Sequence, residues 1–405
     1  MTVDRYRVVV VAPYCPAGRG GVVLLGGAAK QRAVLRGLAE CQQKSLLVNS
    51  GHQTEGWRTG SVRGLRLPDL HIAELHPPTL PLRPLGKFLQ CLLAPFIGYR
   101  LQRRYRPTLV WLYNSYLFEA LYAWGARIAD PGVQLVLELE DLPAARRRAG
   151  LGYVKILLDG WGLSFLSRRV DGATVVQESM RRALPSRLRR VWYMPVLLSD
   201  SYMKDFAPTG GVSFVGYFGE LSVEKGVEGL LEIIRRSPGN CRWLICGAGE
   251  LSKDIERLAR EMPQRLAYLG AVDEAGFRRA YESVTAVVNL HKPLAGFSRG
   301  VFPYKILEAV AAGKITLSTD MDGCPIEVAG AIHWLKGDPV SSCLEALNRL
   351  PEIGDAMLEN REEARRWVRA NFTAGNAIRR ILEGLSMQGN SSAKENDDSK
   401  SGDVS

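Results

Sequence analysis

The stretch FSRGVFPYKILEAVAAGKITLST, residues 297–319, indicates the fold class most directly. Pro303 suits the first position of a helix, where its missing N–H costs nothing. Three apolar residues then mark one helix face: Ile306, Leu307 and Val310. Gly313 suits the position just past the helix end, and KITLST from Lys314 is typical of a buried strand. The stretch therefore predicts a loop, a short helix and a strand of an α/β sheet.

The rest of the second half repeats this unit. We expect strands at 212–219, 243–246, 267–270 and 286–290. Helices are expected at 227–236, from after the glycine turn at 247–249 to about 261, and at 274–282. Residues 361–385 are strongly helical in pattern. Residues 388–405 contain no large apolar residue except Val404 and are predicted to form a disordered tail.

The first half shows the same order of elements. A buried strand at 7–13 runs into the glycine-rich loop at 18–21, a helix at 28–40 and a strand at 45–48; further strands are expected at 108–114, 134–141 and 174–177. The composition turns polar at 197–211, where a domain boundary is expected. We predict an α/β protein of two tandem Rossmann-like domains that face a cleft, at 1–205 and 206–387, whose final helix could cross back.

The composition is that of a soluble globular protein, with 46% hydrophobic and 23% charged residues. Seven scattered cysteines without a CxxC motif favour reduced thiols in a cytosol. No signal-peptide pattern and no long apolar run are found. Residues 1–200 hold 28 Lys and Arg against 14 Asp and Glu, a net charge of +14, whereas the remainder carries −3 of the total +11. A basic half implies an anionic partner.

Two segments of the basic half mix large apolar residues with arginines, at 85–106 and 146–169. Such segments can lie in a membrane interface and attract anionic lipid. The alternative for each is a core helix with a solvated basic tip. Together they favour a cytoplasmic protein that is peripheral on the inner face of the plasma membrane. Nucleic acid is not expected as a partner, because the basic residues are not interleaved with a stacking platform of aromatics.

Polar residues near predicted helix starts and strand ends are the candidate site residues. Lys305 and Glu308 are neighbours on one helix, whose start could hold a phosphate while the carboxylate grips sugar hydroxyls. An ordinary surface pair is the alternative. Asn114, Glu140 and Asp141 follow strands whose carboxyl ends should bind a ligand. A carboxylate there could accept a proton, although Asp141 could instead cap the next segment.

Neither a metal nor a cofactor is expected. His71 and His76 flank Glu74, but the spacing is not HExxH and the following Pro-Pro favours a loop. The sequence DMD at 320–322 follows a strand in a glycine turn and is interpreted as a loop.

Several segments of the second domain resemble one family when taken together. They are GYFGELSVEKGVEGLL at 216–231, LICGAGEL at 244–251, YLGAVDEAGF at 268–277 and FPYKILEAVAAGKITLST at 302–319. In the first domain, VVVVAPY with its glycine loop and VDGATVVQESM are similar to the usual flanks. These segments resemble the GT-B fold glycosyltransferases of family 4, or group 1, over about residues 1–385.

The resemblance implies transfer of a sugar from a nucleotide-sugar donor to a saccharide or lipid-linked acceptor, in polysaccharide or glycoconjugate biosynthesis. It implies retention of anomeric configuration, without a metal. Lys225 would neutralise the donor diphosphate, the helix start at Tyr304 and Lys305 would supply N–H groups to the phosphate, and Glu308 would bind the ribose. Further donor contacts are implied at Gly20, Gly21, Gly219, Gly249 and Val272. The candidate residues on the acceptor side are Asn114, Glu140 and Asp141.

The chain departs from the family pattern at three places. Glu220 stands where the family usually has Arg, Gly300 where one form has a first Glu, and Glu140–Asp141 where a His is usual. Two alternatives therefore stay open. One is a catalytically degenerate scaffold on the same fold that binds membrane or polyanion, and the other is a nucleotide-sugar epimerase.

Overall fold

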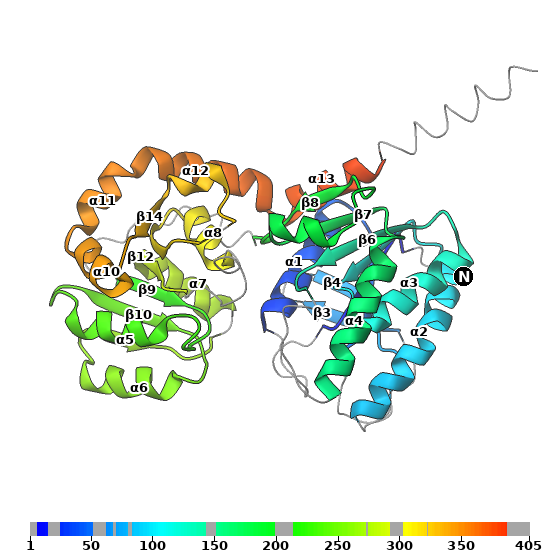
Figure 1. The fold of residues 1–405 in the computed structure, drawn as a ribbon, viewed down its shortest axis with the longest axis horizontal. Helices are drawn as coiled ribbons and strands as arrows, with labels where there is room; N and C mark the ends of the chain where they lie inside the picture. Colours follow the sequence, from blue (N-terminus) through cyan, green and yellow to red (C-terminus); the bar gives the residue numbers. More distant parts are fainter. Residues whose placement is uncertain are drawn as a thin grey trace, which may run out of the picture. The chain divides into compact units, whose positions relative to one another are not determined.

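Strand β1 (Val8–Ala12) lies at the centre of the first sheet, and every one of its residues is buried. The computed structural model describes residues 6–14, 25–51, 62–67, 70–79, 83–142, 151–198, 214–272, 274–291, 303–321 and 323–386. They form two α/β units (Figure 1). Unit 1 comprises residues 1–197 and 374–405, and unit 2 comprises residues 198–373. Both units carry a sheet dominated by parallel strands, which confirms the predicted fold class.

Unit 1 is built on a sheet of order β3-β4-β2-β1-β5-β6-β7-β8. Only the edge pair β3–β4 is antiparallel. The strands are β1, β2 (Ser45–Asn49), β3 (Val62–Leu67), β4 (Leu70–Leu75), β5 (Leu109–Tyr113), β6 (Gln134–Leu139), β7 (Gly172–Val175) and β8 (Val191–Tyr193). The helices are α1 (Leu25–Glu40), α2 (Arg83–Tyr105), α3 (Leu117–Ala129), α4 (Leu151–Ser167), the 3-10 helix η2 (Glu178–Ala183) and α13 (Ala374–Ser386).

Helices cover both faces of this sheet, as a parallel sheet requires. Alternate residues of β1 join a core with α1 and α13: Val8, Val10 and Ala12. The other residues of β1, Val9 and Val11, are equally buried on the opposite side. There α3 packs between α2 and α4 (Figure 1). The run of valines is therefore apolar because the strand has no solvent face.

Unit 2 is built on an all-parallel sheet of order β11-β10-β9-β12-β13-β14. The strands are β9 (Phe214–Phe218), β10 (Arg242–Cys246), β11 (Leu266–Tyr268), β12 (Val284–Asn289), β13 (Ile315–Thr319) and β14 (Ile332–Leu335). The helices are α5 (Val227–Arg236), α6 (Ser252–Glu261), α7 (Glu274–Ser283), α8 (Tyr304–Ala311), α9 (Ile326–Ala329), α10 (Pro339–Asn348), α11 (Leu350–Ala356) and α12 (Leu358–Phe372). One core lies under α5 and α10, and a second lies under α7 and α8.

The structure differs from the predicted elements in several places, and no element was predicted for β14 or for helices α3, α9, α10 and α11. The histidine- and proline-rich region expected as loop contains β3 and β4, because Pro77 and Pro78 follow β4 and do not interrupt it. The short strand β8 was not predicted. The helical run at 361–385 is broken at Thr373, whose extended backbone separates α12 from α13.

The boundary between the two units lies close to the predicted one, but the C-terminal helix α13 belongs to unit 1. The division lies after Leu197, whereas the sequence placed it at 205/206. Helix α13 buries Ile378 and Ile381 in the core of unit 1. The predicted tail at 388–405 lies outside the described residues. Within the described residues, no helix is both long enough and apolar enough to span a bilayer.

Two helical glycines of unit 1 give a matched test of this packing. A Cβ on Gly125 of α3 would lie 1.8 Å from the backbone O of Pro95 in α2, whereas a Cβ on Gly160 of α4 meets nothing within 4 Å. We expect Gly125→Ala to destabilise unit 1 by about 1–3 kcal/mol through overpacking. Gly160→Ala should stabilise it by about 1 kcal/mol, because alanine favours the helix. Urea unfolding of both variants checks the opposite signs; equal effects would contradict the close α2–α3 contact.

Candidate active site

The sheet of unit 2 has its topological switch point between β9 and β12. The strand order runs from β9 to β10 and β11 on one side, and from β12 to β13 and β14 on the other. The loops that leave β9 and β12 therefore diverge, and in open α/β sheets ligands bind in the crevice at the carboxyl ends of such strands. The predicted donor residues of unit 2 follow these strand ends.

Closely stacked glycines shape the loops after β9 and β10. Gly219 follows β9 with φ +142°, and Gly247 follows β10 with φ +151°. A Cβ on Gly247 would lie 1.8 Å from the backbone O of Gly219, and one on Gly249 would lie 2.4 Å from that of Leu221. Side chains at these positions would push the two loops apart. The glycines thus keep backbone, and not side chains, at this edge of the sheet.

A fourth glycine, next to Lys225, brings that lysine to the end of β12. Gly226, the N-cap of α5, has φ +75°, and a Cβ there would lie 2.0 Å from the backbone O of Leu290. This close approach brings Lys225 Nζ to 3.0 Å from Nε2 of His291. An ammonium only donates, so Nε2 accepts and the ring proton lies on Nδ1. Nδ1 of His291 is buried and has no hydrogen-bond partner among the described residues.

Lys305, in the first turn of α8, adds a second positive charge to the same place. Its Nζ lies 4.3 Å from the centre of the Tyr217 ring. Burial and the nearby Lys225 lower the pKa of Lys305 to about 7. Burial and the two lysines likewise lower the pKa of His291 to about 4, so the imidazole is neutral at pH 7. Each of these shifts opposes positive charge, so the cluster would be stabilised by an anion.

The other predicted donor residues lie on α8 and just after β11. Helix α8 begins at Tyr304, and Pro303 at its N-cap supplies no side-chain hydrogen bond. Glu308 is half-buried one turn further along α8, and its charge helps raise the pKa of Tyr281. Val272 follows β11 and packs partly against the core under α7 and α8.

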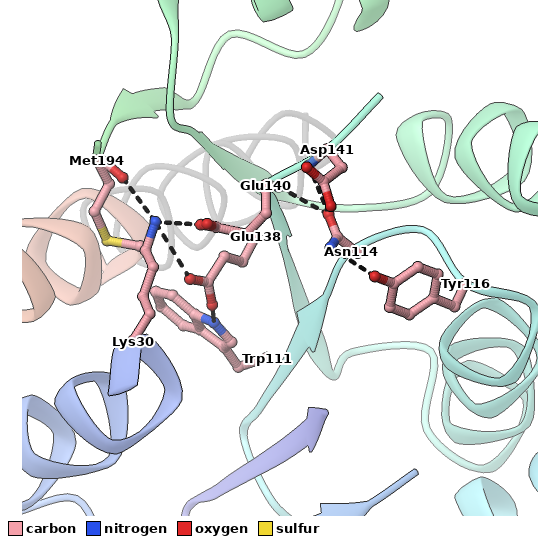
Figure 2. Close-up of polar contacts among 8 residues, drawn as sticks. All are labelled: Lys30, Trp111, Asn114, Tyr116, Glu138, Glu140, Asp141 and Met194. Atoms are coloured by element: carbon pink, nitrogen blue, oxygen red, sulfur yellow. Dashed lines mark hydrogen bonds and ion pairs between the residues drawn. The ribbon is translucent and has the colours of Figure 1, made fainter. Parts of the chain in front are cut away.

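In unit 1, a different cluster lies at the ends of β5, β6 and β8, shown in Figure 2. The ammonium of Lys30, on α1, forms an ion pair with Glu140 and donates a 3.0 Å hydrogen bond to the backbone O of Met194. Its Nζ also lies 3.7 Å from Oε1 of Glu138, whose Oε2 accepts 2.6 Å from Nε1 of Trp111. Burial raises the pKa of Glu138 to about 7 against the lowering effect of Lys30. Two carboxylates thus share one buried cation.

Asn114 holds the loop that carries the two predicted acidic residues. Its Oδ1 accepts hydrogen bonds from the backbone N–H of Glu140 at 2.8 Å and of Asp141 at 3.1 Å. Its Nδ2 donates to the hydroxyl of Tyr116 at 3.2 Å, and the residue has φ +59° (Figure 2). Asn114 is buried, whereas Asp141 is exposed. The structure therefore brings all three together and gives Asn114 a positioning role.

Some predicted residues lie outside the described part of the chain: Gly20, Gly21, Gly300 and Asp322. Glu220 is exposed.

The pair His76–Glu74 belongs to a buried network, in which Glu74 also accepts from Nδ2 of Asn49 at 2.9 Å. Within the described residues, no group of three or more His, Cys, Asp and Glu side chains could hold a metal ion.

Sequence reasoning missed Lys30, Glu138 and His291. Each had a signal: Lys30 lies in the apolar pattern of a core helix, Glu138 interrupts a buried strand, and His291 directly follows one. A charged residue within an apolar run is costly unless it is paired, so Lys30 and Glu138 could have been sought as partners. Lys30 on α1 and Glu138 on β6 lie far apart in the sequence, so no local sequence pattern could predict that they pair.

Removing the shared cation should make unit 1 sensitive to pH. Folding raises the pKa of Glu138 above its ordinary value, so the folded state binds the Glu138 proton more tightly than the unfolded state does. The stability that this proton contributes is lost as pH rises through about 7. Lys30→Met should be destabilised less at pH 5, where Glu138 is protonated, than at pH 8, where the loss should reach about 3–5 kcal/mol because the unpaired Glu138 carboxylate is then ionised and buried.

Urea unfolding at both pH values, followed by tryptophan fluorescence, measures this difference. Arg236→Met is the control, because Arg236 pairs with Glu232 on the surface of α5 and both side chains are about half-exposed. It should change stability by less than about 1 kcal/mol at either pH. An equal loss for Lys30→Met at pH 5 and pH 8 would refute the shared-cation interpretation.

Comparisons with known proteins agree with the geometry. Residues 212–351 match the family model described as "Glycosyl transferases group 1". Comparison of the sequence with curated proteins finds no significant match. Among solved structures, sucrose-phosphate synthase from Thermosynechococcus elongatus is similar, with TM-score 0.63 and 15% identity over 96% of this chain and 98% of that one. HepE from Anabaena in complex with UDP and glucose gives TM-score 0.63 and 15% identity over 94% and 100%.

The UDP-forming α,α-trehalose-phosphate synthase from Burkholderia vietnamiensis gives TM-score 0.60 and 13% identity over 94% of this chain and 100% of that one. At these identities the structural matches show the fold, and the family model matches a segment within unit 2. The strand order, the glycine loops after β9 and β10 and the start of α8 lie in, or directly beside, the matched residues. The chain therefore has the GT-B fold, and its residues 212–351 match the model of the group 1 glycosyltransferases.

Proposed function

We propose that the protein is a glycosyltransferase that moves a sugar from a nucleotide-sugar donor, bound by unit 2, to a saccharide or lipid-linked acceptor. The observation that carries this proposal is the basic cluster of Lys225, His291 and Lys305 at the switch point of the sheet. No carboxylate of the described residues pairs with either lysine. Such a cluster suits a ligand with two negative phosphates.

Each group of the cluster has a role in the proposed reaction. The nucleoside diphosphate leaves with its negative charge, and Lys225 and Lys305 stabilise that charge as it develops. The first N–H groups of α8 point along the helix axis and add a partial positive charge. The Nδ1–H of His291 is a buried donor for an oxygen of the donor sugar or phosphate. Glu308 accepts hydrogen bonds from the ribose hydroxyls.

Two finer points belong to the same proposal. Transfer retains the anomeric configuration, as the family resemblance implies. It needs no metal ion, because the fixed positive groups neutralise the diphosphate as a divalent cation would. Glu140 and Asp141, held by Asn114, contact the acceptor. The similarity to HepE, whose structure was solved with UDP and with glucose, supports a uridine nucleotide as the first donor to test.

Nucleotide binding gives the direct test of the donor site. We expect UDP or another nucleoside diphosphate to raise the melting temperature, since a ligand at a hundred times its Kd adds about 2.7 kcal/mol to the folded state. UDP, GDP and ADP should be compared. No shift with any of the three would contradict the proposal and favour a scaffold that has kept the fold without the activity.

Variants of Lys225 and Glu308 test the assigned contacts. Lys225→Met and Glu308→Gln should each lower kcat/KM for transfer by about a hundredfold or more, because each removes a bond to the leaving group or ribose. Lys253→Met and Glu256→Gln, on the exposed side of α6, are the matched controls and should keep full activity. Circular dichroism should show all four variants folded. Full activity of the first pair would overturn the assignment.

The lowered pKa of Lys305 predicts how donor binding depends on pH. A phosphate prefers the protonated amine, and in the free protein Lys305 loses its proton above about pH 7. The second ionisation of a phosphate is complete by then, so the ligand charge stays constant. The affinity for UDP should therefore weaken by up to about tenfold per pH unit above pH 7. Titration calorimetry from pH 7 to 9 should show this slope in wild type and lose it in Lys305→Met.

A further inference from the structure

Helices α2 and α4 of unit 1 present large apolar side chains to solvent. Five exposed residues follow one another along α2 at intervals of three and four: Leu85, Phe88, Leu92, Phe96 and Tyr99. Four more lie on α4: Val154, Leu157, Leu158 and Trp161. We call these nine residues the apolar face. Phe88 and Phe96 are 63% and 60% exposed, so the packing of unit 1 does not account for them.

The inner sides of the same helices are fully used in packing. On α2, Gln90, Ala94 and Leu101 are buried. Helix α3 lies between α2 and α4, with Gly125 against Pro95, and with Gly162 of α4 close to Ser115 at its start. Both helices therefore have a packed inner side, and the exposed apolar face is their outer side. The two helices, with α3, lie on one side of the sheet of unit 1 (Figure 1).

The charges beside the apolar face are of one sign. Exposed arginines lie at or just past the C-terminal ends of the two helices: Arg100, Arg103, Arg104, Arg168 and Arg169. The acidic residues within α2, α3 and α4 are only Glu119 and Asp159, and both are buried. Helices α2, α3 and α4 therefore expose aromatic, aliphatic and basic side chains to solvent, but no carboxylate.

We propose that the apolar face is the surface by which unit 1 binds an anionic lipid bilayer. The stripe on α2 extends over roughly 20 Å, long enough for a helix to lie flat in the interface. Its phenylalanines and leucines would enter the boundary between headgroups and acyl chains, while the arginines contact lipid phosphates. This proposal goes beyond the donor site and does not depend on catalysis, because only residues of unit 1 are involved.

The charges favour a bilayer over a second copy of the chain. Two copies that met through this face would bring arginines together without a carboxylate on either set of helices to pair with them. An anionic bilayer satisfies both features at once, since it takes up apolar side chains and supplies negative charge.

Vesicle flotation tests the proposal on the full chain. Wild-type protein should float with vesicles that contain about one quarter phosphatidylglycerol in phosphatidylcholine, and should float less with phosphatidylcholine alone or at high salt. Phe88→Ser with Phe96→Ser should lower the partition coefficient by about a hundredfold, since each phenylalanine loses the gain of leaving water. Arg100→Glu with Arg103→Glu should abolish the preference for anionic vesicles.

Controls separate binding at this face from a general effect of surface changes. Ile326→Ser with Leu358→Ser removes exposed apolar residues of unit 2, and Arg235→Glu with Lys253→Glu reverses exposed charges there. Both should float like wild type, and UDP shifts should be the same in all variants. Absence of flotation of the wild type would overturn the proposal, as would an equal loss in the unit 2 variants. A dimer in light scattering that dissociates in Phe88→Ser with Phe96→Ser would likewise overturn it and assign the face to a second copy.

Discussion

Burial of both faces of each sheet is the constraint on which the rest of the molecule depends. Strands such as β1 and β12 have no solvent face, so their side chains are almost all apolar. A polar group can then reach a ligand only from the loops at the strand ends, or by entering from a helix that covers the sheet. The glycines after β9 and β10 and at the start of α5 follow from this, because the loops at one edge must approach closely to form a site.

The two units treat buried charge differently. In unit 1, Lys30 is balanced by Glu138 and Glu140, so the cluster is neutralised within the protein and fixes the loop after β6. In unit 2, the positive charges of Lys225 and Lys305 repel each other, and together with burial they lower the pKa of His291. The first arrangement stabilises a structure, whereas the second becomes favourable when an anion arrives. This contrast is the physical reason for assigning the donor to unit 2.

The helices of unit 1 combine a structural and a surface role. Their inner sides complete the burial of the sheet, so the small residues Gly125 and Gly162 allow close packing. Their outer sides carry aromatic and basic residues in place of the charged mixture expected of a soluble surface. A lipid-linked acceptor would fit a protein that rests on a membrane, and in that case unit 1 would meet its acceptor where the lipid is.

The sequence by itself determined the repeated strand–helix units, because these depend on periodicity, glycine positions and local spacing, and its resemblance to a known family indicated the GT-B fold. It also indicated the amphipathic character of the segments that form α2 and α4. Only the tertiary structure decided that Asn114 holds the loop of Glu140 and Asp141, that Lys30 pairs with Glu138, and that His291 meets Lys225. It also returned α13 to unit 1 and showed β3 and β4 in a region that composition marked as loop. Such contacts join residues far apart in the chain: the bonds from Asn114 and from Lys30 to Glu140 span 26 and 110 positions. They depend on strand order and on burial, which no local pattern in the chain records.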